Sequence, residues 1–268
     1  GAGRIIKENS DGMFVVESDQ VASITGANGE VRETFSFLSR AFSSVKDGET
    51  VTLLKDVPAA DAQYSVSNKS FTLDLNNYSI DGTRYFTLYI NRYGEPVDVI
   101  IKNGTIRNTW NGADNGPLGM AVWANQNVNL TLDNVILEAA EAPGGKQSFG
   151  LRIGNASGNT SNPSVTIKGE DTEIAGATAG ISVIGNGASA VSSLTLEAGT
   201  VYGSDFGIVG NGDCDGTSIE IKGGTVRSTS EDGCAIYHPQ DGDLTVSGGT
   251  LEGANGVQFC GEGKLSIE

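Results

Sequence analysis

Two decapeptides, Ile219–Ser228 (IEIKGGTVRS) and Leu244–Gly253 (LTVSGGTLEG), repeat one pattern 25 residues apart. In each, apolar and polar residues alternate up to a Gly-Gly pair, and another apolar residue follows. Alternation with a period of two is typical of a strand with one buried face, and paired glycines are typical of a tight turn. The recurrence of the unit predicts that one copy stacks on the other.

The pattern extends over most of the chain. We expect the inward strand position to recur at Leu75, Ile101, Leu132, Ile167, Leu196, Ile221, Val246 and Ile267. After each turn another buried position is expected at Ile80, Ile106, Leu137, Ile174, Val201, Val226 and Leu251. A second strand recurs, as in Gly119–Val122, Gly150–Ile153 and Gly180–Val183. Because a single unit cannot bury its apolar face alone, the units must stack.

These units predict an all-β fold, a single-stranded right-handed parallel β-helix with a short N-terminal capping helix. A leucine-rich horseshoe requires a Leu/Asn consensus that is missing, and a propeller requires longer units built from antiparallel hairpins. A sandwich would not keep the turn after the strand in fixed register through successive units. The β-helix is therefore favoured over these three alternatives.

The domain organisation follows from where the repeat begins. Residues 1–34 form an N-terminal segment with a hairpin, Val21–Thr25 and Glu30–Arg32 around a Gly-Ala-Asn-Gly turn. Residues 35–50 are expected to hold a capping helix, Phe35–Lys46, with Thr34 as its cap. Residues 51–268 form the β-helix of about eight to nine coils, with the first strand at Val51–Leu54. Since the chain stops inside a strand, we expect the β-helix to continue beyond residue 268 or to be closed by a self-contact.

Composition limits the partners. The formal net charge is −16 and the pI about 4.4, so the chain repels phosphate backbones and nucleic acid is a poor partner. No apolar run is long enough for membrane insertion. The sequence contains no zinc-binding motif, and no cofactor is expected. Three cysteines, Cys214, Cys234 and Cys260, are expected to be free and mostly buried. Cys214 and Cys260 are expected to lie two coils apart, roughly 10 Å. The single His238 is expected to pack at a coil corner.

Five aspartates lie near the C-terminal end, and two interpretations remain open for them. They are Asp213, Asp215, Asp232, Asp241 and Asp243. Several oxygen ligands suit Ca²⁺, whereas Asp-Gly is also ordinary turn chemistry. We favour turn residues over a metal site.

Several motifs carry a resemblance to a known family. They are VKDGETVTLLKDV (Val45–Val57), FTLDLNNYSIDG (Phe71–Gly82), the SGGTLEG repeat and AIYHPQDGDLTVSGGT (Ala235–Thr250). With these the chain resembles the pectate-lyase-like right-handed β-helix superfamily, and within it most of all uncharacterised extracellular and cell-wall proteins of Gram-positive gut bacteria. The resemblance implies a secreted or cell-surface bacterial protein and a polysaccharide or a host or cell-surface glycan as the partner class.

The outward positions do not predict catalysis. Hydrolysis or elimination on a polysaccharide needs clustered carboxylates, or a cation beside a base. The outward row of the first strand is instead rich in threonine: Asp74, Ile100, Thr131, Thr166, Thr195, Glu220 and Thr245. The residues after each anchor alternate in charge: Asn76, Lys102, Asp133, Lys168, Glu197, Lys222 and Ser247. Both rows favour a structural surface, and we assign no catalytic residue.

Aromatic residues give the best indication of binding. The outward row of the second strand is expected to contain Tyr89, Ala121, Arg152, Ser182, Val209, Tyr237 and Gln258. Trp123 also faces outward, and Trp110 lies in the loop 107–118. Trp110, Trp123, Arg152 and Tyr237 can together stack on sugar rings and bind their hydroxyl groups. The alternative is that both tryptophans cover loops against the coil.

The sequence therefore predicts a non-catalytic β-helix module of a secreted or cell-surface protein, serving as a stalk or an adhesive surface. A carbohydrate-binding module is the first alternative, and a polysaccharide lyase or glycoside hydrolase is the second. The three differ in the outer surface. An enzyme requires a groove with at least two carboxylates, whereas a stalk requires only a smooth polar face.

Overall fold

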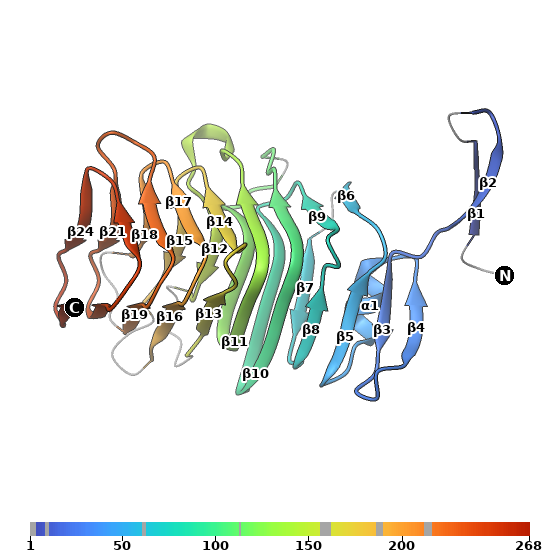
Figure 1. Ribbon diagram of the computed structural model, residues 1–268, viewed down its shortest axis with the longest axis horizontal. Helices are drawn as coiled ribbons and strands as arrows, with labels where there is room; N and C mark the ends of the chain where they lie inside the picture. The colour runs from blue at the N-terminus through green and yellow to red at the C-terminus, as the bar shows by residue number, and fades with distance from the viewer. Residues whose placement is uncertain are drawn as a thin grey trace.

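The computed structural model describes residues 4–8, 11–60, 63–112, 114–155, 162–185, 190–211 and 216–268. The chain winds into a solenoid whose coils stack in sequence order along one axis (Figure 1). Its regular secondary structure is nearly all β-strand, at 58% of the residues, with one short α-helix near the N-terminus of the described chain. This confirms the predicted fold class, an all-β parallel β-helix. Within the described ranges no helix has the length and apolar character needed to traverse a bilayer.

Each coil contributes one strand to each of three parallel sheets. The first sheet stacks β5 (Glu49–Leu53), β8 (Phe71–Asp74), the middle of β10 (Phe86–Asn108) and of β11 (Gly119–Ala139), β13 (Ser164–Lys168), β16 (Ser192–Leu196), β19 (Thr217–Ile221), β22 (Gly242–Val246) and β25 (Leu265–Ile267). The second stacks β6 (Val57–Ala60), β9 (Ser79–Gly82), the ends of β10 and β11, β14 (Glu173–Gly176), β17 (Thr200–Gly203), β20 (Thr225–Ser228) and β23 (Thr250–Glu252). The third stacks β7 (Tyr64–Ser67), the starts of β10 and β11, β12 (Ser148–Ile153), β15 (Ala179–Val183), β18 (Phe206–Val209), β21 (Cys234–His238) and β24 (Asn255–Phe259).

The core is a stack of apolar rows inside the coil. From Ile101 to Ile267 every neighbouring pair of the predicted first-sheet row is a backbone partner. The predicted second-sheet row, Ile80 to Leu251, is also paired at every step. Because apolar area removed from water stabilises by about 25 cal/mol per Å², these rows hold the coils together. The sequence prediction of both rows is thus confirmed over most of their length.

The predicted register is wrong by two residues in one coil. Ile101 pairs with Leu73, whereas the sequence analysis placed Leu75 in that row. Both leucines are fully buried, so the apolar alternation continues through the position where the strand ends. The turn that follows Leu73 is two residues longer than the turn after Ile101, and a pattern of period two cannot detect a slip of two.

A second slip of two residues affects the third sheet. Val122 pairs with Leu151, and Trp123 pairs with Arg152, so Gly119 does not align with Gly150 as predicted. Consequently Trp123, rather than Ala121, occupies the outward row with Tyr89 and Arg152. Ala121 is fully buried on the inner side.

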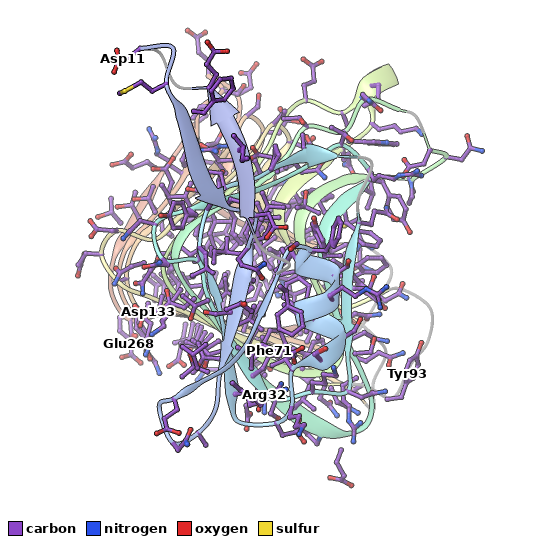
Figure 2. All side chains as sticks on the ribbon, turned by 90° about the vertical axis from the view of Figure 1, so that its right-hand side faces the viewer. Asp11, Arg32, Phe71, Tyr93, Asp133 and Glu268 are labelled. Carbon is purple, nitrogen blue, oxygen red and sulfur yellow. The ribbon has the colours of Figure 1, made fainter. Side chains whose placement is uncertain are left out.

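The N-terminal region closes the first coil. Strands β3 (Ala22–Thr25) and β4 (Val31–Phe35) form the predicted hairpin, and β3 adds antiparallel to β5. Helix α1 (Leu38–Ser44) is shorter than the predicted Phe35–Lys46, because Phe35 ends β4, and Phe37 rather than Thr34 is the N-cap. The Phe42 ring packs against Phe71 of the first-sheet strand β8 at 6.1 Å, so α1 covers the end of the core (Figure 2). Strands β1 (Arg4–Glu8) and β2 (Phe14–Ser18) form a separate antiparallel hairpin.

The Gly-Gly pairs of the opening motif have a conformational reason. The second glycine of these pairs, Gly224 and Gly249, has φ of 74° and 84°, and Gly199, which follows Ala198 at the equivalent position, has φ of 91°. A Cβ atom on Gly224 would lie 2.5 Å from the carbonyl oxygen of Gly199 in the preceding coil. Only glycine adopts this φ without strain and also allows the coils to stack so closely.

The outer face of the first sheet carries two polar rows. With the corrected register the threonine row begins with Thr50 and Thr72, and the charged row begins with Asp74 rather than Asn76. Lys102 Nζ lies 3.2 Å from Asp74 Oδ2, and Lys168 Nζ lies 3.6 Å from Asp133 Oδ2. Such exposed pairs contribute about 0.2–1 kcal/mol each, and their alternation disfavours a slip by one coil.

His238 packs in the interior at a coil corner, as the sequence predicted. The ring is fully buried, stacks on Phe259 with 4.9 Å between centroids, and its Nε2 lies 3.2 Å from Thr217 Oγ1. Its Nδ1 is buried without a hydrogen-bond partner in the described structure. Burial lowers the pKa of His238 below its ordinary value of 6.5.

A buried neutral histidine predicts a loss of stability in mild acid. Because the pKa of His238 is lower in the folded state, the unfolded state binds a proton below about pH 6.5 while the folded state remains neutral. As the pH decreases, the unfolding free energy therefore decreases by at most about 1.4 kcal/mol per pH unit. Urea unfolding at pH 7.5 and 5.5 measures the loss. His238→Gln should show a smaller loss over this interval, and an equal loss in both proteins would contradict the assignment.

Candidate functional site

The outer face of the second sheet carries a row of large side chains with one break. Successive partners along this row are Asp81, Arg107, Glu138, Ala175, Tyr202, Arg227 and Glu252. Each follows an inward residue of the second-sheet core row, so the β-strand alternation turns it toward solvent. Ala175, on β14, is the only small member of the row.

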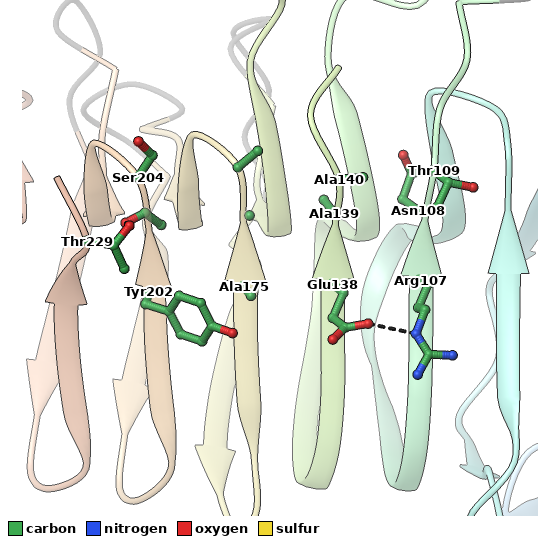
Figure 3. Close-up of a pocket in the computed structure, with 13 residues that line it drawn as sticks. Arg107, Asn108, Thr109, Glu138, Ala139, Ala140, Ala175, Tyr202, Ser204 and Thr229 are labelled. Atoms are coloured by element: carbon green, nitrogen blue, oxygen red, sulfur yellow. Dashed lines mark hydrogen bonds and ion pairs between the residues drawn. The ribbon is translucent and has the colours of Figure 1, made fainter. Parts of the chain in front are cut away.

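The break at Ala175 opens a groove of about 550 Å³ across β10, β11, β14 and β17, which continues to Thr229, directly after β20. We call it the Ala175 groove; Figure 3 shows its lining. Strands in a sheet lie about 4.8 Å apart, so the groove extends about 19 Å along the solenoid axis. Its floor is made of small residues, among them Ala139, Gly176 and Gly203. An elongated groove of this size suits an extended ligand.

One wall of the groove is an ion pair between two coils. Arg107 Nε donates to Glu138 Oε2 at 2.7 Å, and Arg107 Nη1 also lies 3.6 Å from Asp81 Oδ1 (Figure 3). The two carboxylates raise the pKa of Arg107 against the opposing effect of burial. The guanidinium is thereby fixed in one orientation, with its remaining N–H groups available to acceptors.

The opposite wall is the ring of Tyr202. Its hydroxyl group donates to Glu173 Oε1 at 2.5 Å, and the Arg227 guanidinium lies over the ring at 4.6 Å from the centroid. The hydrogen bond to Glu173, together with burial, raises the pKa of Tyr202 to about 12, so the phenol keeps its proton. In Figure 3 the ring extends across the sheet toward Ala175. Held at its hydroxyl end, it presents an aromatic wall next to the groove floor.

Among the described residues that line the groove, Glu138 is the one carboxylate. Glu138 already accepts from Arg107, and Glu173 already accepts from Tyr202. Acid–base cleavage of a glycosidic bond needs one carboxyl group as proton donor and a second as base or nucleophile. The groove instead offers an apolar floor, an aromatic wall and polar groups at its rim, the arrangement of a binding site.

The structure does not place the four residues predicted for ligand binding in one site. Trp110 is 3% exposed, with Lys146 Nζ over its ring at 4.7 Å, so the ring packs under a loop and has no free face. Trp123 and Arg152 are neighbours on the third sheet, with the guanidinium 5.8 Å from the ring centroid. Trp123 Nε1 donates to the Gly154 carbonyl oxygen at 2.8 Å.

Tyr237 lies on the same outward row but three coils from Arg152, separated by Ser182 and Val209. At about 4.8 Å per coil this is about 14 Å. Its ring stacks on Phe206 with 5.4 Å between centroids. Of the predicted set, only Trp123 and Arg152 form one local cluster.

The aspartates and cysteines have simpler roles where the structure describes them. Asp241 accepts from the backbone N–H of Glu262, and Asp243 accepts from that of Lys264 at 2.9 Å, so both aspartates bind the next coil. Asp243 lies in strand β22, so the interpretation as a turn residue is wrong for it. Asp213, Asp215 and Cys214 lie outside the described residues. Among the residues that are described, no cluster of three or more metal-ligating side chains occurs. Cys234 and Cys260 are free; Cys234 is buried as expected, but Cys260 is exposed because it follows the last third-sheet strand.

The sequence analysis missed the Ala175 groove, although its signal was available. The position after each second-sheet core residue reads Arg107, Glu138, Ala175, Tyr202 and Arg227. When these residues are aligned coil by coil, a single small residue, Ala175, stands between the large side chains of Glu138 and Tyr202. That absence of a side chain is what opens the groove.

The structure thus combines a parallel β-helix with an elongated outer groove. Comparison with family models, with curated proteins and with solved structures gives no match to this chain, and the functional argument therefore depends on its fold and its own residues.

Proposed function

We propose that this chain is a non-catalytic β-helix module of a secreted or cell-surface protein, and that it binds a glycan chain in the Ala175 groove. The proposal joins the adhesive surface predicted from the sequence with its carbohydrate-binding alternative. One observation carries it: the row of large side chains on the second sheet is interrupted at Ala175, beside the fixed ring of Tyr202.

The groove matches the chemistry of a sugar chain. Pyranose rings have an apolar face that packs against an aromatic ring, and hydroxyl groups that both donate and accept hydrogen bonds. Tyr202 supplies the ring, while Arg107 and Glu138 supply a donor and an acceptor. The groove follows the solenoid axis over several coils, so successive sugar residues would meet successive strands.

The occupied carboxylates favour binding without cleavage. Both Glu138 and Glu173 are already engaged by donors of this protein. A ligand in the groove would therefore be held by hydrogen bonds and ring packing, with no free acid beside the glycosidic oxygen.

A glycan array on the purified protein, followed by calorimetry on the best ligand, tests the proposal. Ala175→Trp fills the groove and should weaken binding at least tenfold, which corresponds to about 1.4 kcal/mol. Tyr202→Ala should weaken it to a similar degree because the ring is lost. Tyr202→Phe keeps the ring and should retain most of the affinity.

Thr166→Trp is the matched control, since it places the same side chain on the same coil but on the outer face of the first sheet. It should bind like the unmodified protein. Absence of binding on a broad array would favour a bare stalk and reject the proposal. Release of reducing ends from a bound polysaccharide would reject its non-catalytic part.

A further inference from the structure

Arg152 on β12 is a partly buried cation with no anionic partner among the described residues. The chain has 33 acidic and 17 basic residues, and Arg32, Arg84 and Arg107 each lie within 3.9 Å of a carboxylate. Within the described chain Arg152 makes no hydrogen bond and no ion pair, and its guanidinium lies over the Trp123 ring. A guanidinium withdrawn from water without an acceptor is unfavourable, so its surroundings favour an added anion.

The surroundings of Arg152 form a small hollow on the outer face of the third sheet. The hollow measures about 230 Å³ and is lined by Gln147, Phe149, Arg152, Ser182, Val209 and Asn211, among other residues. Among its described lining residues none is a carboxylate. It is smaller than the 300–1,000 Å³ typical of ligand pockets, so it suits a single group or a small molecule.

The polar groups of the hollow offer mainly donors. The Ser182 side chain is 3% exposed, and its hydroxyl group makes no hydrogen bond to any described residue. Asn211 Oδ1 accepts from the Gly185 N–H at 3.0 Å, which leaves the Asn211 amide NH₂ as a donor. Ser182 is the direct neighbour of Arg152 on the next coil. Three donor groups from successive coils therefore surround a space with no carboxylate among its described lining residues.

We propose that this hollow is a binding site for a small oxyanion, a carboxylate or phosphate group held by the Arg152 guanidinium with Ser182 and Asn211 as further donors. Guanidinium N–H groups match both anions in geometry and bind two oxygens at once. The site lies on the third sheet and the Ala175 groove on the second, so the two proposals are independent. Trp123 covers one side of the guanidinium and limits its movement.

The charge state of Arg152 is compatible with this role. Burial lowers its pKa from 12.5 to about 10, and the guanidinium therefore stays protonated at neutral pH. A bound anion would favour the charged form and raise the pKa again.

Titration of ¹⁵N-labelled protein at pH 7.4 with phosphate or with acetate, at constant ionic strength set by chloride, tests the site. We expect saturating shifts of the Arg152 and Ser182 amide signals, and of the Arg152 Nε–H signal, with at least one of the two anions. Phosphate alone would indicate a tetrahedral ligand, acetate alone a planar one, and both a general oxyanion site; each supports the proposal. No saturable shift with either anion would overturn it.

Arg152→Gln should weaken the binding at least tenfold, whereas Arg40→Gln, an exposed arginine on α1, should leave it unchanged. Circular dichroism confirms that both variants keep the strand content. If Arg152→Gln is folded and binds the anion as the unmodified protein does, the shifts arise elsewhere and the proposal is wrong. Should Arg152→Gln fail to fold, Ser182→Ala, which removes one donor, must weaken binding; unchanged affinity would reject the site.

Discussion

Ile167→Asp is expected to unfold the centre of the solenoid. Ile167 is fully buried between Leu132 of the preceding coil and Leu196 of the next. The substitution removes a buried apolar side chain and places a carboxylate where no donor faces it, a cost of about 3–5 kcal/mol or more. Because each coil is stabilised chiefly by its neighbours, the loss extends to adjacent coils.

Circular dichroism and urea unfolding measure this effect. Thr166→Asp is the control, since Thr166 is the adjacent residue on the same strand with its side chain on the outer face. It should change the unfolding free energy by less than about 0.5 kcal/mol. An Ile167→Asp protein with the unfolding midpoint of the unmodified protein would mean that the first-sheet row does not form the core.

Gly176→Ala is expected to cost about 2–3 kcal/mol although it adds a single methyl group. A Cβ atom on Gly176 would collide with the Ala179 carbonyl oxygen, and it would lie 2.7 Å from the Ser148 carbonyl oxygen and 2.8 Å from Phe149 Cα. All three neighbours are backbone atoms of the third sheet, where it meets the second. They cannot rotate away as a flexible side chain would, so the coil itself must distort.

Thermal and urea unfolding should be measured for Gly176→Ala and for Ala177→Val. The comparison distinguishes a clash with backbone atoms at residue 176 from the effect of added side-chain volume alone. Ala177 is the next residue and lies on the outer surface of the same groove, so extra methyl groups there meet solvent. The Ala177 variant should keep the stability of the unmodified protein. Equal stability of the Gly176 variant would show that the corner is looser than the structure indicates.

The sequence predicts the stacked rows because they repeat. Ile101, Leu132 and Ile167 are found by one rule, apolar alternation up to a turn, and the structure pairs them directly. The rule fails where alternation continues past the strand end, as at Leu73 and Leu75, since both residues are buried and only turn length distinguishes them. Slips of one residue would expose the apolar face, but slips of two leave it buried.

The candidate site was less accessible to sequence analysis. The prediction weighted tryptophan and tyrosine, but Trp110 packs under a loop and Tyr237 lies far along the row from Trp123. Exposure depends on what loops cover, which no local pattern encodes. The Ala175 groove arises from a missing side chain, and a search for chemically active residue types passes over an alanine.

Because charges of opposite sign alternate along the first sheet, the number of coils in this stretch can change by two, but not by one, without bringing like charges together. Asp74, Lys102, Asp133, Lys168, Glu197 and Lys222 follow one another coil by coil. Deleting or duplicating one coil would place two like charges on adjacent strands about 4.8 Å apart, whereas a change by two coils would preserve the alternation. Within this stretch the protein should therefore tolerate shortening or lengthening in pairs of coils better than in single coils.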